Sequence, residues 1–242
     1  NMELTTIGRD FAKKTKQLLD GLDEALLGIQ GVGGARMGEI TIACVPSAVY
    51  YFLPQVLRSY HEIFPKIRIK VHDASANEVL SVVANGEADF GVNFVGSDES
   101  NIEFKTIFEE QFVVACRKDH ILSKKKKVTW EEVSKYDFMT VSKSSGNRML
   151  IDLALAGKSQ APNIIYEAQH VTTLLGLVEA GMGIAVVPSL AMPSKDHPVL
   201  ASVPLVDPVV SRRIGLISKK GRSLAPAAEK LYELLLALSR NN

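Results

Sequence analysis

VEAGMGIAVVP, the stretch from Val178 to Pro188, decides the fold more than any other part of the sequence. An apolar helix is predicted to end at Gly181, because glycine readily adopts the left-handed conformation that closes helices. Gly183 then lets the backbone turn directly into a buried strand of four apolar residues, which Pro188 ends. The stretch is typical of a helix-to-strand joint in an α/β sheet, and by itself it indicates a fold and no function.

Length and composition fit a globular protein of one large domain or two small ones. The chain has 242 residues, of which 46% are hydrophobic, and its formal net charge is +1. A charge so close to zero gives little support for nucleic-acid binding by this segment. We find no apolar run long enough to span a bilayer and no secretory leader, so we expect a cytoplasmic chain without a membrane partner. Cys44 and Cys116 fit a reducing compartment as buried small side chains.

Residues 1–30 are predicted to form a long helix that packs against a partner helix. One seam position recurs every seven residues and is occupied by Leu4, Phe11, Leu18 and Ala25. An apolar heptad of this kind is typical of helices that dimerise. An ordinary amphipathic surface helix is the alternative. A glycine-rich break at 31–34 separates this helix from the rest of the chain.

Beyond that break, strand patterns alternate with amphipathic helix patterns. Strands are predicted at 39–45, 67–73, 88–94, 138–141, 163–167, 184–187, 200–205 and 213–218, with one or two more in 104–117. Helices are predicted at 51–64, 77–85, 129–135, 147–156, 172–180 and 224–239. Such alternation builds mostly parallel sheets with helices on both faces.

The alternation predicts two modules, one before about residue 115 and one after it. The last strand and helix have no obvious place in the second module, so we expect them to return to the first. The chain would then cross between the modules twice, near Arg117 and near Asp207-Pro208. Two crossings make a hinged clamp, whose seam is a natural ligand cleft.

Four predicted strand-to-helix turns carry short hydroxyl or amide side chains. They are the segments 45–48, 73–77, 141–147 and 169–173. Helix capping alone explains any single one of these residues. Four such turns facing one cleft would also gather free backbone N–H groups and helix dipoles, which favour an anion. We therefore expect a small anionic ligand, by preference a carboxylate.

The sequence offers few groups for chemistry at such a cleft. Arg148 could supply a fork for a carboxylate or could be a solvated helix residue, and His170 is expected as pocket wall. The sequence has no nucleophile elbow, no phosphate loop, and no His or Cys spacing that would bind a metal. We therefore expect no catalytic residue, no cofactor and no metal site.

Four segments resemble, in the right order, motifs of the LysR-type transcriptional regulators. LTTIGRDF at 4–11 resembles the opening of the family's linker helix, with Ile7 in place of the usual alanine. GEITIA at 38–43 resembles its first strand, and 77–92 resembles its E-L-L-x-x-L-x-x-G-x-L-D-x-A-I segment. The joint at 178–188 resembles its late Gly-x-Gly-x-x-x-x-Pro motif. Each motif is degenerate alone, whereas the series is fairly specific.

The resemblance implies an α/β fold of two Rossmann-like subdomains with the periplasmic-binding-protein type II architecture. Two crossover strands would join them, and the long N-terminal helix would precede them. Residues 1–30 would be the linker and dimerisation helix, 37–115 with 210–242 regulatory subdomain I, and 116–209 regulatory subdomain II. The resemblance also implies a homodimer or tetramer, and contact with DNA only through a winged helix-turn-helix that is missing from this sequence.

Carried over residue by residue, the resemblance also implies an effector cleft. Its lining would be Ser47, Ala48, Ser75, Ala76, Ser144, Ser145, Asn147, His170, Val171 and Thr172. Ala76 departs from the threonine of some relatives, which removes one side-chain hydrogen bond.

We therefore expect the effector-sensing and oligomerisation part of a bacterial LysR-type regulator, which binds a small metabolite without transforming it. One alternative is an extracytoplasmic solute-binding protein of the same fold, which would lack the long dimerising helix and would be exported. Another is a small-molecule enzyme, which would need a placed acid, base or metal.

Overall fold

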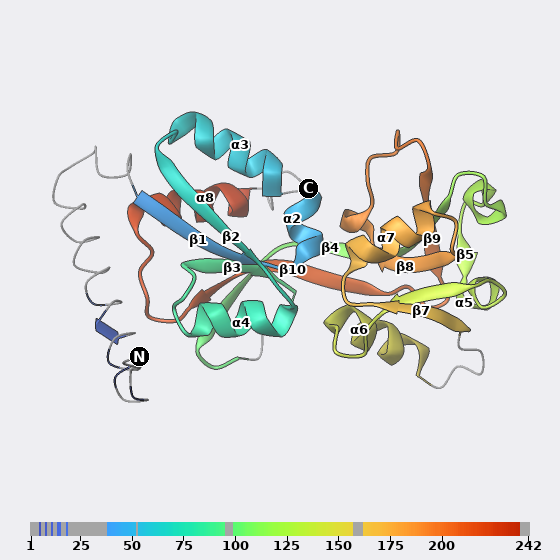
Figure 1. The fold of residues 1–242 in the computed structure, drawn as a ribbon, viewed down its shortest axis with the longest axis horizontal. Coiled ribbons are helices and arrows are strands. Elements are labelled where there is room, and N and C mark those ends of the chain that lie inside the picture. The colour runs from blue at the N-terminus through green and yellow to red at the C-terminus, as the bar shows by residue number, and fades with distance from the viewer. Residues whose placement is uncertain are drawn as a thin grey trace.

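The structure, a computed structural model, describes residues 38–51, 53–94, 99–156 and 162–237, together with six single residues before position 20 (Figure 1). The helix predicted at 1–30 lies outside the described residues except for these six. Five of the six are helical, namely Gly8, Phe11, Lys14, Thr15 and Leu18. The dimerising seam of this helix stays a prediction. Within the described part of the chain, no helix is both long and apolar enough to cross a bilayer.

The first half of the chain, completed by the last strand and helix, forms one sheet covered by helices on both faces. The sheet has the order β2-β1-β3-β10-β4 and is built from β1 (Gly38–Cys44), β2 (Ile67–Asp73), β3 (Phe90–Asn93), β10 (Ser211–Lys219) and the first part of β4 (Ile102–Arg117). The helices are α2 (Pro46–Tyr51), α3 (Leu53–Ile63), α4 (Ala76–Ala84) and α8 (Pro226–Ala237). Figure 1 shows α3 and α8 on one face of this sheet and α4 on the other.

The second half forms another sheet, with the order β4-β8-β6-β7. Its strands are β6 (Phe138–Val141), β7 (Ile164–Ala168) and β8 (Ile184–Pro188), and β9 (Leu200–Val206) joins β4 to the short β5 (Val128–Thr129). The helices are α5 (Trp130–Val133), α6 (Gly146–Leu155) and α7 (Val171–Glu179), with 3-10 turns η2 (Ile121–Lys124) and η3 (Ser189–Ala191). Helices α6 and α7 lie on opposite faces of this sheet (Figure 1).

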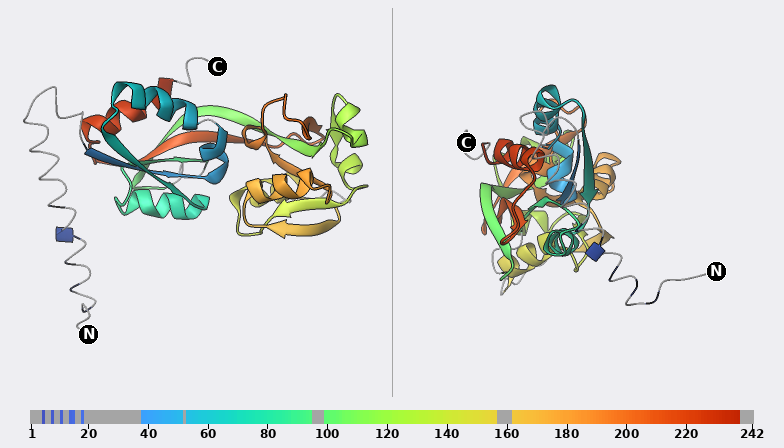
Figure 2. Two further views of the ribbon diagram at one scale, coloured as in Figure 1. Left: turned by 45° about the horizontal axis from the view of Figure 1, so that its top comes forward. Right: turned by 90° about the vertical axis from the view of Figure 1, so that its left-hand side faces the viewer.

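Strands β4 and β10 connect the two halves, which lie end to end (Figure 2). Up to Gln111, β4 pairs antiparallel with β10, and from Phe112 onward it pairs antiparallel with β8 and β9. The pairs β1–β2, β1–β3, β6–β7 and β6–β8 are parallel. The predicted α/β fold is therefore confirmed as a mixed sheet structure, parallel within each half and antiparallel where the chain crosses.

The predicted joint before β8 is present and has a physical basis in its backbone bonds. The N–H of Gly181 donates to the carbonyl of Val178, and the N–H of Met182 donates to that of Leu177, at 2.9 and 3.0 Å. These two bonds form a Schellman motif, which requires the left-handed conformation that Gly181 adopts with φ 83°. Gly183, with φ 146°, starts the extended backbone that leads into β8.

Strand β8 is buried on both faces, which explains its unbroken apolar sequence. Ile184 and Val186 pack into the core beneath α6, whereas Ala185 and Val187 pack into the core beneath α7. Strands of parallel sheets covered on both sides show such continuous apolar runs instead of alternation.

The helix predicted at 51–64 is wrong in extent, because the structure has α2 and α3 in its place. Pro46 is the first residue of α2, where proline's missing N–H costs nothing. Pro54 lies at the second position of α3, in the first turn, where proline is tolerated.

Candidate ligand-binding cleft

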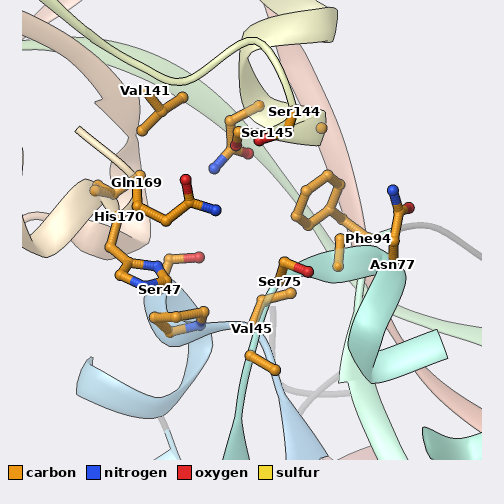
Figure 3. Close-up of a pocket in the computed structure, with 16 residues that line it drawn as sticks. Val45, Ser47, Ser75, Asn77, Phe94, Val141, Ser144, Ser145, Gln169 and His170 are labelled. Carbon is orange, nitrogen blue, oxygen red and sulfur yellow. The ribbon is translucent and has the colours of Figure 1, made fainter. Parts of the chain in front are cut away.

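A cleft between the two halves is lined by the turns that follow five strands. These turns are Val45–Ser47, Ala74–Asn77, Phe94, Val141 with Ser144–Asn147, and Gln169–Val171. Figure 3 shows Ser144, Ser145 and Gln169 from the second half facing Ser47 and Ser75 from the first. The space between the lining atoms is about 530 Å³ when the open mouth is included.

The structure brings together most of the residues that the sequence nominated. Eight of the ten line the cleft, namely Ser47, Ser75, Ala76, Ser144, Ser145, Asn147, His170 and Val171. Ala48 does not line it, because this residue is only 3% exposed and packs into the core of the first half. Thr172, the second residue of α7, also lies outside the lining.

The lining includes further residues that were not nominated: Val45, Pro46, Ala74, Asn77, Phe94, Val141, Gly146 and Gln169. Asn77 and Gln169 belong to turns already singled out, so their amides could have been chosen. Phe94 follows β3 in a turn that carries no pattern of hydroxyl groups. Phe94 is not a polar cap residue, so the pattern that predicted the other lining residues does not indicate it.

The helices α2, α4, α6 and α7 begin at the cleft, and the cap residues of the last three differ in which hydrogen-bonding groups they leave free. The Ser75 hydroxyl accepts a hydrogen bond from the Glu78 N–H at 3.4 Å and so caps α4. Ser145 and His170 occupy the caps of α6 and α7, yet neither side chain makes a capping hydrogen bond. The first N–H groups of these two helices and both cap side chains are therefore available to a ligand.

A chain of side-chain hydrogen bonds joins two of the lining turns. The Ser142 hydroxyl donates to Gln169 Oε1 at 3.1 Å and lies 2.9 Å from the Ser144 hydroxyl. This contact leaves the amide nitrogen of Gln169 free to donate elsewhere.

A buried ion pair lies beside the cleft, between β4 and β10. Arg212 Nε donates to Glu110 Oε1 at 2.8 Å, and Nη2 lies 2.7 Å from the same oxygen; the two side chains are 1% and 3% exposed. The guanidinium also lies 4.7 Å from the centre of the Phe94 ring. Burial lowers the pKa of Arg212, and the carboxylate of Glu110 opposes that effect.

Arg148 does not act as the carboxylate fork that was one of its two predicted roles. It lies outside the lining, and its Nε donates to Asp152 Oδ1 at 2.7 Å on the same helix. Its Nη1 is 3.7 Å from Glu167 Oε2 on β7. It is also not solvated, because it is only 9% exposed.

No Asp, Glu, Lys or Arg is among the described residues that line the cleft. An anion there would be held by neutral donors and helix starts. Over the described ranges, no three His, Cys, Asp or Glu side chains come close enough together to hold a metal ion.

Sequence comparisons give the family. The LysR substrate binding domain model matches residues 33–240. The uncharacterized HTH-type transcriptional regulator YbhD of Escherichia coli K12 is 40% identical over 235 residues, which cover 97% of this chain and 74% of that protein. The uncharacterized HTH-type transcriptional regulator YfeR of Shigella flexneri is 31% identical over 96% of this chain and 75% of its own length.

Comparisons with solved structures agree on the fold. The effector binding domain of QuiR in complex with shikimate aligns with a TM-score of 0.73 at 20% identity, covering 85% of this chain and 99% of that one. The regulatory domain of Synechocystis PCC6803 CcmR in complex with 2-PG aligns with a TM-score of 0.75 at 19% identity over the same shares. Since the family model spans most of the sequence, the chain belongs to the LysR-type transcriptional regulators, and residues 33–240 are its substrate-binding domain.

Proposed function

We propose that the cleft binds a small anionic metabolite, by preference a carboxylate, as the effector of a LysR-type regulator. The observation that carries this proposal is the convergence of the starts of α4, α6 and α7 on one cleft without a charged side chain in its described lining. Each helix start contributes about 0.3–1 kcal/mol to anion binding, and each charge-assisted hydrogen bond about 1.5–3 kcal/mol. Three such contacts reach the roughly 8 kcal/mol of a micromolar ligand.

The small-molecule complexes of QuiR and CcmR support this class of ligand. Family membership favours a regulator over an exported solute-binding protein. No acid–base pair or metal cluster among the described lining residues suggests turnover, so the chain is proposed to bind its ligand without transforming it.

Signal transmission would use the two halves as subdomains I (37–115 with 210–242) and II (116–209). A ligand that contacts both favours one closure of the cleft, and only such differential binding can shift a conformational equilibrium. We further propose that the protein is a cytoplasmic homodimer or tetramer assembled through residues 1–30. DNA contact would come from a separate winged helix-turn-helix.

Replacing Ser145 by alanine should weaken binding of an acid effector about 10- to 100-fold, because one charge-assisted hydrogen bond is lost. The unfolding temperature without ligand should stay unchanged, since Ser145 makes no capping hydrogen bond. Thermal-shift titration with sulfate, benzoate, citrate and shikimate measures both. An acid at 100 times its dissociation constant stabilises the wild type by about 2.7 kcal/mol, a shift of roughly 5–10 °C.

Ser134→Ala is the matched control, because Ser134 follows α5 outside the cleft and its hydroxyl donates to the Glu131 carbonyl at 2.8 Å. Its acid affinity should equal that of the wild type. Equal affinities for all three proteins, or stabilisation of the wild type by none of these acids, would count against the site.

A further inference from the structure

Arg212 contacts polar side chains of both halves at the cleft. Its Nη2 donates to the Ser47 hydroxyl on α2 at 2.9 Å, and its Nη1 donates to Asn147 Oδ1 on α6 at 2.7 Å. Glu110 neutralises the charge of Arg212 from the other side. Arg212 therefore acts on the cleft through the orientation of its two partners, and its net charge contributes little.

A guanidinium can only donate hydrogen bonds, and this property fixes how Ser47 and Asn147 are oriented toward Arg212. Arginine has five N–H donors and no acceptor, so every partner must turn an acceptor toward it. Asn147 therefore presents its oxygen to Arg212 and has its NH₂ group pointing elsewhere, which removes the usual ambiguity of an amide. The Ser47 oxygen accepts from Arg212 with one of its two lone pairs, which leaves its proton to donate.

Both partners line the cleft and keep a donor unused. Ser47 and Asn147 are 5% and 7% exposed, and both border the cleft. Within the described part of the chain, neither the Ser47 proton nor the Asn147 NH₂ group has an acceptor. Neither atom is among the described buried polar atoms that lack a partner, so both donors open onto the cleft, where a ligand acceptor can replace water.

We propose that Arg212 is a positioning residue that makes Ser47 and Asn147 a pair of donors, so that this part of the cleft takes an ionised acid group and rejects an amide or amine. The inference rests on the proposed effector site and identifies where in it the acid group lies. An oxyanion accepts from both donors and from the nearby start of α6. An amide offers one oxygen in place of two, and an N–H that it turns toward the Asn147 NH₂ group finds no acceptor there.

Asn147→Asp tests the donor claim with almost no change of shape. The aspartate still accepts from Arg212, and a carboxylate is favoured in the first turn of α6, but it turns an oxygen toward the cleft in place of NH₂. Isothermal titration with benzoate and benzamide measures the effect. Wild type should bind the acid at least about tenfold tighter than the amide, and in Asn147→Asp this ratio should fall by tenfold or more.

Asn77→Asp is the matched control, because Asn77 also lines the cleft but has no contact with Arg212. It adds the same charge at the same kind of helix start. The acid-to-amide ratio should therefore fall less in Asn77→Asp than in Asn147→Asp. If the acid-to-amide affinity ratio fell equally in the two variants, the added negative charge alone would explain the effect, and the inference would be overturned.

A ligand-free measurement separates this inference from the proposed function. Asn147→Asp keeps the acceptor for Arg212 whereas Asn147→Leu removes it, so the leucine variant should unfold several degrees below the aspartate variant. Equal unfolding temperatures would overturn the orienting role whatever the cleft binds. If the temperatures differ but wild type shows no preference for benzoate, the acid specificity falls together with the proposed function. If wild type prefers the acid and Asn147→Asp keeps that preference, only the present inference falls.

Discussion

Arg212→Met is expected to lower the free energy of unfolding by about 3–5 kcal/mol. The substitution keeps the length of the side chain but removes the cation that faces Glu110, whose side chain is 3% exposed. It also takes away the donors to Ser47 and Asn147. An uncompensated buried carboxylate is among the most costly defects of a folded protein. Urea unfolding at pH 7 measures the loss.

The matched control is Lys230→Met on α8, which removes the cation of an exposed pair. Lys230 Nζ is 2.9 Å from Glu233 Oε2, with side chains 49% and 56% exposed. Solvent screens such a pair, so the change should stay within about 0.5 kcal/mol. Glu110→Met combined with Arg212→Met should recover part of the loss, because two apolar side chains leave no buried charge. A loss under about 1 kcal/mol in Arg212→Met would contradict this account of the buried pair.

The sequence predicted the regular elements well where local chemistry is decisive. Strands β2 and β6 begin and end at the predicted residues, since alternation or an apolar run is bounded there by turns. The joint before β8 was predictable because only glycine suits a left-handed residue, and Gly181 adopts that conformation. Helix propensity did not predict that α2 begins as early as Pro46, a residue that suits the first position of a helix.

The site was predictable as far as it follows from topology. Strand ends gather at one edge, so hydroxyl and amide residues in four turns were expected to meet, and eight of the ten nominated residues do line one cleft. Phe94 and Arg212 were not predictable in this way. Both owe their place to pairs far apart in sequence: Arg212 meets Glu110 from 102 positions away and Ser47 from 165. The sequence next to each of these residues does not indicate which distant residue it will contact.

Gly183→Ala should destabilise the protein by roughly 2–4 kcal/mol, the second large effect expected here. With φ 146°, the backbone at Gly183 is in a region that side chains rarely allow, and an added Cβ would lie 2.5 Å from the carbonyl oxygen of Asp137. That oxygen cannot retreat freely, because it accepts the hydrogen bond of the Ile184 N–H at 3.0 Å. Relief of the clash would therefore disturb the start of β8.

Gly176→Ala in α7, the helix before the joint, should have the opposite effect on stability. Nothing lies within 4 Å of a Cβ at Gly176, and the residue is exposed inside a helix. Alanine there should stabilise the protein by about 0.5–1 kcal/mol, because glycine loses more conformational freedom on folding. Urea unfolding of both variants and of the wild type measures whether each substitution lowers or raises the free energy of unfolding. If Gly183→Ala were as harmless as Gly176→Ala, the close approach of Asp137 could not be what requires glycine at the joint.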